Sequence, residues 1–80
     1  RDSSLPFEIN QQEMESLGIS SRELEVLQLM SQGLSNQEIA SALFVSLNTV
    51  KTHAARIFEK LAVQRRTQAI EKAKKCGLIP

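Results

Sequence analysis

Residues 46–58, SLNTVKTHAARIF, hold polar side chains whose types and spacing could recognise double-stranded DNA. Lysine donates hydrogen bonds to O6 and N7 of guanine, and the methyl group of threonine can contact the methyl group of thymine. Lys51 and Thr52 are therefore candidates for reading base edges in the major groove. Ala55 is small enough to let a helix sit deep in that groove.

Phosphate contacts are expected on both sides of this base-reading segment. Arg56 and Lys60 lie further along, where a helix would leave the groove and pass the DNA backbone. Asn48 and Thr49 lie at the helix N-terminus, where free amide groups and the helix dipole favour a phosphate oxygen.

The same argument makes Ser35 and Asn36, at the start of the helix expected before this segment, candidate phosphate contacts. An alternative stays open, because Ser35, Asn48 and Thr49 could act only as helix caps or their neighbours. His53 flanks the buried side of its helix, so a packed or backbone-bonded histidine is as reasonable as a phosphate contact.

A helix over about residues 47–62 would position these groups. Ser46 supplies the N-cap, and apolar residues then follow at spacings of four, three and four. These apolar positions are Val50, Ala54, Ile57 and Leu61. They form one buried stripe, so the opposite face, which carries Lys51 and Thr52, is turned outward.

Two capping boxes mark the helices that precede it. Ser20 with Glu23, and Ser35 with Glu38, have the spacing at which the serine hydroxyl and the glutamate side chain each take a backbone amide. The first helix is expected to run to about Gln32, before Gly33, and the second is short. Their inward residues are expected to be Leu24, Val26, Leu27, Met30, Ile39, Ala40 and Leu43.

Two helices joined by a tight turn, the second one basic on its exposed side, are typical of a helix-turn-helix. A fourth helix is expected over about residues 66–76, with Ile70 and Ala73 inward. Residues 11–17 could form a further short helix that ends at Gly18. No segment shows the alternation of a strand, so the predicted fold class is all-α, a four-helix bundle that contains a helix-turn-helix.

Charge is unevenly distributed along the 80 residues, although the net charge is only +1. Residues 1–45 hold two arginines against seven acidic residues, a net charge of −5, whereas residues 46–80 hold eight lysines or arginines against two glutamates, a net charge of +6. A charge run alone would favour a solvated helical face. Together with the helix-turn-helix pattern it indicates a surface that binds a polyanion.

Composition argues against several other classes of protein. With one Cys, Cys76, and one His there is no plausible zinc site and no internal disulfide, which fits a reducing cytosol. No apolar run approaches the roughly 18 residues of a membrane span. No nucleophile, metal or paired-carboxylate constellation suggests an enzyme, and no cofactor or metal is expected. The chain begins with Arg1 rather than Met, so we expect a piece of a longer protein.

Over about residues 19–80 the sequence closely resembles the LuxR-type (GerE-like) helix-turn-helix of bacterial transcription regulators. The matching segments are ISxRExEVL from Ile19, GLSNQEIA from Gly33, TVKTH from Thr49, IxxKLxV from Ile57 and RTQA from Arg66. The resemblance implies four helices, of which the third reads DNA and the fourth pairs two copies across a two-fold axis. With Ile70 and Ala73 inward, the stripe left for the second copy is Thr67, Glu71 and Lys74.

The resemblance also implies an output domain of a bacterial transcription regulator, of the response-regulator kind found in two-component systems. Residues 1–18 would be a linker or the tail of a missing upstream sensory domain, and residues 19–80 the DNA-binding domain. The implied partners are double-stranded DNA, a second copy of the chain and the upstream domain, with RNA polymerase as a further candidate. The implied location is the bacterial cytoplasm, with no membrane partner.

Two positions depart from the family pattern. Ala62 stands where a glycine usually ends the third helix, so that turn could be tighter or could continue as helix. Arg65 stands where Ser, Asn or Asp usually caps the fourth helix, so it could instead serve a phosphate.

Two other functions would be compatible with the same predicted helices. A four-helix module that docks a protein partner would be expected to have a mixed-charge third helix without a polar cluster at its start. A sigma-factor domain 4 would lack the motif Arg66-Thr67-Gln68-Ala69.

Overall fold

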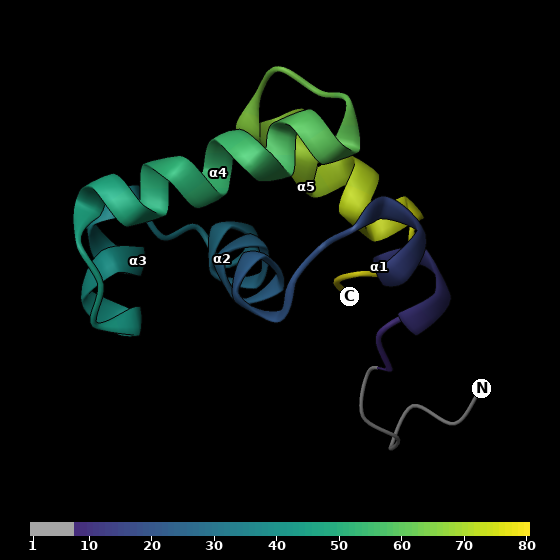
Figure 1. The fold of residues 1–80 in the computed structure, drawn as a ribbon, viewed down its shortest axis with the longest axis horizontal. Helices are drawn as coiled ribbons and strands as arrows, with labels where there is room; N and C mark the ends of the chain where they lie inside the picture. The colour runs from purple at the N-terminus through teal and green to yellow at the C-terminus, as the bar shows by residue number, and fades with distance from the viewer. Residues whose placement is uncertain (1–7) are drawn as a thin grey trace.

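The structure, a computed structural model, describes residues 8–80, and within them it contains five α-helices and no strand (Figure 1). The helices are α1 (Gln11–Leu17), α2 (Ser21–Ser31), α3 (Asn36–Leu43), α4 (Leu47–Leu61) and α5 (Arg66–Lys75). The expected all-α class is confirmed. Of the expected linker, residues 1–7 lie outside the described residues.

Helices α2 and α4 form the centre of the fold. Helix α4 packs on α2, α3 and α5, while α2 also contacts α3 and α5. Figure 1 shows α4 running along one side of the molecule, with α3 near its beginning and α5 near its end. Helices α2 to α5 are therefore the four expected helices, and α1 is the short additional helix, placed at the opposite end from α3.

Side-chain caps start the first four helices, and at α2, α3 and α4 the caps are the expected Ser20, Ser35 and Ser46. Ser20 accepts from the Glu23 amide at 3.1 Å while Glu23 accepts from the Ser20 amide at 3.0 Å, which completes the capping box of α2. Ser35 and Glu38 form the same box at α3, and Ser46 caps α4. Asn10 caps α1, which ends at Gly18 in the left-handed conformation, as the sequence indicates.

The core gathers around the apolar stripe of α4. Its four residues are buried together with apolar residues of α2 and α3 and with Leu78 and Ile79 after α5. The expected inward residues of α2 and α3 are all buried except Leu43, which is half-buried. On α5 the expectation needs a correction: Ala69 is the fully buried partner of Ala73, and Ile70 is only half-buried. The spacing of four between Ala69 and Ala73 places both on the face that meets α2 and α4.

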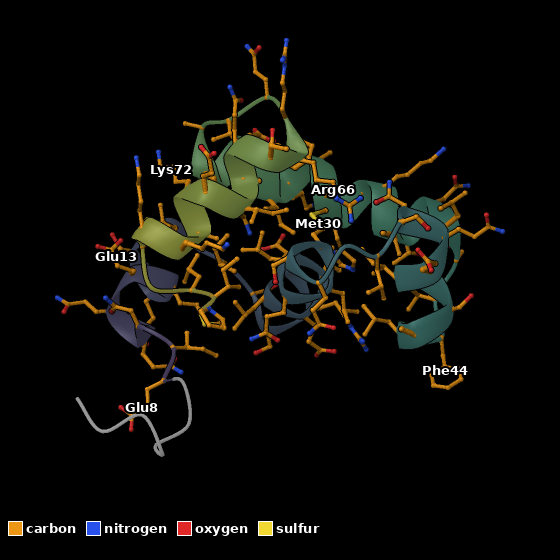
Figure 2. All side chains as sticks on the ribbon, turned by 180° about the vertical axis from the view of Figure 1, so that it is seen from behind. Glu8, Glu13, Met30, Phe44, Arg66 and Lys72 are labelled. Atoms are coloured by element: carbon orange, nitrogen blue, oxygen red, sulfur yellow. The ribbon has the colours of Figure 1, made fainter. Side chains whose placement is uncertain are left out.

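Two helix ends have a left-handed conformation without a glycine. Ala62, after α4, has φ of 56°, and Phe44, after α3, has φ of 57°. Helix α4 therefore ends at Ala62, as it would at the glycine usual in the family, and does not continue. Phe44 is 95% exposed and projects from the end of α3 into solvent (Figure 2).

Helix α5 starts without a side-chain N-cap from Arg65, because a guanidinium has no acceptor. The side-chain oxygen of Gln68 compensates, accepting from the amides of Gln64 and Arg65 at 3.1 and 3.2 Å. The fourth helix therefore begins where expected, at Arg66, despite the departure from the family pattern.

We expect Ala62→Gly to stabilise the domain by about 0.5–1 kcal/mol, because glycine adopts a positive φ without steric strain. Ala55→Gly, in the exposed middle of the same helix, should instead destabilise it by about 1 kcal/mol. Urea denaturation of both variants measures the difference. A destabilised Ala62→Gly protein would contradict the strain assigned to this turn.

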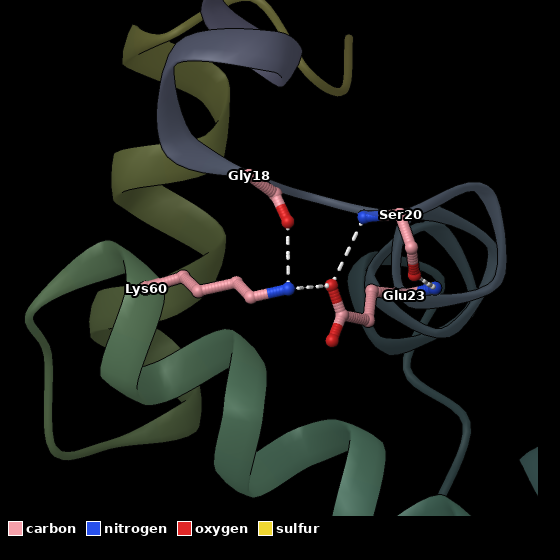
Figure 3. Close-up of polar contacts among 4 residues, drawn as sticks. All are labelled: Gly18, Ser20, Glu23 and Lys60. Atoms are coloured by element: carbon pink, nitrogen blue, oxygen red, sulfur yellow. Dashed lines mark hydrogen bonds and ion pairs between the residues drawn. The ribbon is translucent and has the colours of Figure 1, made fainter.

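Lys60 and Glu23 tie the end of α4 to the start of α2 (Figure 3). The Lys60 Nζ donates to Glu23 Oε1 and to the Gly18 carbonyl oxygen, both at 2.6 Å. Glu23 is only 2% exposed, and its Oε1 also accepts from the Ser20 amide. One carboxylate thus completes a helix cap and anchors a lysine that reaches it from 37 residues further along the chain.

This environment lowers the pKa of Glu23. Burial acts to raise the pKa, but the hydrogen bond from Lys60, the bonds from Ser20 and the Lys60 charge together outweigh it. A carboxyl group with a lowered pKa stabilises the folded state above its unfolded pKa. That contribution is lost as the pH falls through the lowered folded value.

We therefore expect the free energy of unfolding to fall as the pH drops below about 4.5, and Glu23→Gln to reduce this dependence. Part of it should remain, because the pKa of Glu38 is also lowered, by hydrogen bonds from Ser35. Urea denaturation between neutral and acid pH is the measurement. Glu25→Gln, which alters an exposed pair with Arg22, is the control. A Glu23→Gln protein with the wild-type pH profile would contradict this account.

Candidate nucleic-acid interface

The outer face of α4 presents polar side chains opposite the buried stripe. Asn48, Lys51, Thr52, Ala55 and Arg56 are all exposed on it. The arrangement follows from helix geometry, because burying positions 50, 54, 57 and 61 turns the opposite side of the helix to solvent. The structure thus brings together, on one exposed face, five of the α4 residues that the sequence predicts to contact DNA.

Thr52 keeps its hydroxyl within the helix. Its Oγ1 donates to the Asn48 carbonyl at 3.0 Å, one turn earlier. This bond uses the hydroxyl proton on the backbone, so the methyl group is the part of Thr52 suited to an apolar contact with a base.

The N-terminus of α4 is capped and still offers amide donors. Ser46 Oγ accepts from the Thr49 amide at 3.1 Å and lies 2.8 Å from Thr49 Oγ1. Thr49 is therefore a neighbour of the cap, one of the two roles left open by the sequence. The amides of Leu47 and Asn48 make no hydrogen bond within residues 8–80, so they remain available to an anion at the positive end of the helix.

The N-terminus of α3 has the same construction. Ser35 Oγ accepts from the Glu38 amide at 3.2 Å, which leaves the hydroxyl proton of Ser35 able to donate. The amides of Asn36 and Gln37 have no partner among the described residues. Capping and phosphate contact are therefore compatible at Ser35, since they use different parts of the hydroxyl group.

His53 lies on the flank of α4 and is half-buried. Its Nδ1 atom is buried and has no hydrogen-bond partner within residues 8–80. The backbone-bonded reading of His53 is therefore not seen at Nδ1, and the packed reading fits the ring best.

Lys60 differs from the other candidates on α4. Its ammonium group is held by Glu23 and Gly18, so the structure turns it toward the core rather than toward the outer face. The expected phosphate contact is replaced by a structural tie, and we leave Lys60 out of the interface. No local pattern indicates this contact, because the partner Glu23 lies 37 residues earlier in the chain.

Arg66 was also missed as a specific contact by sequence reasoning. Its Nη2 donates to the Leu34 carbonyl oxygen in the turn before α3. By contrast, Arg56 on α4 is exposed. Of the cations that follow Lys60, Arg65, Lys74 and Lys75 are exposed as well.

Among residues 8–80, no group of three or more side chains is placed to hold a metal ion. In the same residues, no helix has both the length and the apolar character needed to cross a membrane.

The sequence profile of the luxR family of bacterial regulatory proteins, GerE, matches residues 17–73. The response regulator protein VraR of Staphylococcus aureus (strain Mu3) is 54% identical over 52 residues, which are 65% of this chain and 25% of VraR. VraR of Staphylococcus saprophyticus is similar to the same extent. The chain thus spans about a quarter of the length of the curated relatives it matches.

Two solved structures have the same fold. The response regulator ChrA, from a haem-sensing two-component system, has a TM-score of 0.75 and 45% identity over 82% of this chain and 35% of its own. The transcription factor GerE has a TM-score of 0.74 and 32% identity over 78% of this chain and 92% of its own. The profile match, which covers more than half of the chain and includes the whole helix-turn-helix, shows that the chain belongs to the luxR family of bacterial regulatory proteins.

Proposed function

We propose that this chain is the sequence-specific DNA-binding output domain of a bacterial transcription regulator. The observation that carries the proposal is the exposed polar face of α4, set opposite its buried stripe within a luxR-family fold. Lys51 and Thr52 contact base edges in the major groove, and Ala55 allows close approach. The domain is a binding module in the cytoplasm and not an enzyme.

The phosphates on either side of the groove bind to the two helix N-termini and to Arg56. Ser35 and Asn36 act at α3, and Asn48 and Thr49 act at α4, through hydroxyl, side-chain amide and backbone N–H donors. His53, which is half-buried on the flank of α4, lies at the edge of this surface. The positive charge of residues 46–80 draws the domain to DNA.

The full-length protein is a response regulator in this proposal. Support comes from VraR and ChrA, which are named response regulators and are much longer than this chain. The residues before the luxR-family region, including α1, then lead in from a sensory domain. RNA polymerase is the partner through which the DNA-bound protein changes transcription.

Two copies bind paired half-sites and meet through α5. Thr67, Glu71 and Lys74 are exposed on the side of α5 away from Ala69 and Ala73. The half-buried Ile70 adds some apolar surface to this stripe. The contact remains mostly polar, so we expect it to be weak without DNA.

We predict that Lys51→Ala lowers affinity for a site selected from random duplexes by about 1–3 kcal/mol and relaxes specificity at one base pair. The measurement is a titration against the selected duplex and against a scrambled one. Lys60→Met, which removes a lysine of the same helix that faces the core, is the matched control. It should lower stability by about 1–3 kcal/mol, because Glu23 stays buried, and leave specificity unchanged. Wild-type affinity and specificity in Lys51→Ala would refute the assignment of α4.

We predict that the free domain is monomeric or weakly dimeric at tens of micromolar and dimerises on DNA. A helix pair through Thr67, Glu71 and Lys74 buries far less than the roughly 1,200 Å² of a stable interface. Two half-sites on one duplex supply the missing local concentration. Sedimentation with Cys76 kept reduced tests the first part, and Thr67→Glu, which should abolish cooperative binding to paired half-sites, tests the second. A tight dimer without DNA, or intact cooperativity in Thr67→Glu, would contradict the prediction.

A further inference from the structure

Arg66 connects two parts of the domain that are distant in sequence. It is the first residue of α5, and its guanidinium donates to the carbonyl oxygen of Leu34, 32 residues earlier. Figure 2 places the half-buried Arg66 beside the connection that leads from α2 into α3. The acceptor is the carbonyl directly before Ser35, the N-cap of α3.

The peptide group between Leu34 and Ser35 is held on both of its polar atoms. Its carbonyl oxygen accepts from Arg66, and its N–H donates to Glu38 Oε1 at 2.8 Å. Because a peptide group is planar, two bonds on opposite edges fix its orientation and therefore the direction in which the chain enters α3. The contact from α5 and the capping box of α3 thus act on the same rigid unit.

The Leu34–Ser35 peptide leads directly into the donors that the proposed function assigns to a DNA phosphate. The Ser35 hydroxyl and the amides of Asn36 and Gln37 follow directly, at the positive end of α3. Their hydrogen bonds depend on direction, since such bonds weaken steeply when donor and acceptor are misaligned. A small rotation of the Leu34–Ser35 peptide would therefore weaken the phosphate contact without unfolding the domain.

We propose that Arg66 is a positioning residue for DNA binding, which orients the phosphate-contacting end of α3 through the Leu34 carbonyl without touching DNA itself. This inference rests on the proposed function. It assigns the start of α5 a role in binding DNA that is separate from pairing two copies of the domain.

The test is a double-mutant cycle between Arg66 and single phosphates. Each phosphate of the selected duplex is replaced in turn by a neutral methylphosphonate, and the phosphate bound by α3 is found as the one that couples to Ser35→Ala. For the wild type, neutralising this phosphate should weaken binding about tenfold. For Arg66→Gln, the same replacement should weaken binding less than about threefold, since the contact is already misaligned.

Two variants separate positioning from charge. Arg65→Gln removes the same charge from the neighbouring exposed residue and should keep the wild-type sensitivity to this phosphate. Arg66→Lys keeps the charge and protects the measurement if Arg66→Gln unfolds. It should lose the coupling because the lysine Nζ lies one bond nearer the backbone than the Nη2 atom with which Arg66 reaches the Leu34 carbonyl. Melting temperatures of all variants are recorded alongside.

A third variant reverses the electrostatic expectation. Glu38→Ala removes a negative charge near the phosphate and also the hydrogen bond that Glu38 accepts from the Ser35 amide. If charge alone mattered, the variant would bind DNA more tightly and stay fully sensitive to neutralising this phosphate. If the orientation of the Leu34–Ser35 peptide matters, the variant should be less sensitive to neutralising it. Weaker coupling is expected.

The proposal is overturned if Arg66→Gln weakens binding to every duplex by the same factor, or if Arg66→Lys keeps the wild-type coupling. Failure of the proposed function is recognised separately, from the wild type alone, as indifference to the selected site or to every methylphosphonate. That result would overturn this inference with it.

Discussion

Burial of one apolar stripe on α4 determines how the rest of the domain is arranged. Val50, Ala54, Ile57 and Leu61 lie at helical spacing and pack into the core formed with α2, α3 and α5. Full burial of each Ile or Leu stabilises the fold by about 1.5–3 kcal/mol. Rotating α4 about its axis would expose them, so the rotation is fixed and the opposite face has to meet solvent or a ligand.

Hydrogen bonds from two cations then limit how far the helices can slide or rotate against one another. Lys60 joins the end of α4 to Glu23 in the first turn of α2 and to Gly18, which ends α1, and Arg66 joins the start of α5 to the turn before α3. Packing of apolar side chains alone tolerates small slides and rotations, whereas hydrogen bonds to a carboxylate or carbonyl depend on direction. Lys60 and Arg66 are therefore two cations that hold the helices of the interface in place through contacts within the domain.

Local signals explain why most of the fold could be predicted. Capping boxes at Ser20 and Ser35 and the stripe of α4 depend on residues three or four apart, so spacing in the sequence is enough to find them. The outer face of α4 follows from the stripe. The family resemblance added the roles of the third and fourth helices.

The errors concern contacts between distant segments. Lys60 is expected at a phosphate because it lies where a recognition helix would leave the groove, and nothing local reveals that Glu23 is buried within its reach. On α5 the expectation places Ile70 inward with Ala73. The narrow space against α2 and α4 favours two alanines instead. Arg65 offers no side-chain cap, and this loss is offset by Gln68, which lies at the position where a capping box has Glu or Gln and accepts from the Arg65 amide.

The central claim, that α4 and the N-termini of α3 and α4 form the DNA-binding surface, is tested most directly by NMR. The isotope-labelled domain would be titrated with the selected duplex while backbone amide shifts are followed. The central claim predicts the largest changes at residues 35–37 and 47–56, smaller changes on α5 where two copies meet, and nearly unchanged amides on α1. Largest changes on α1 or α5, with the outer face of α4 unaffected, would contradict it.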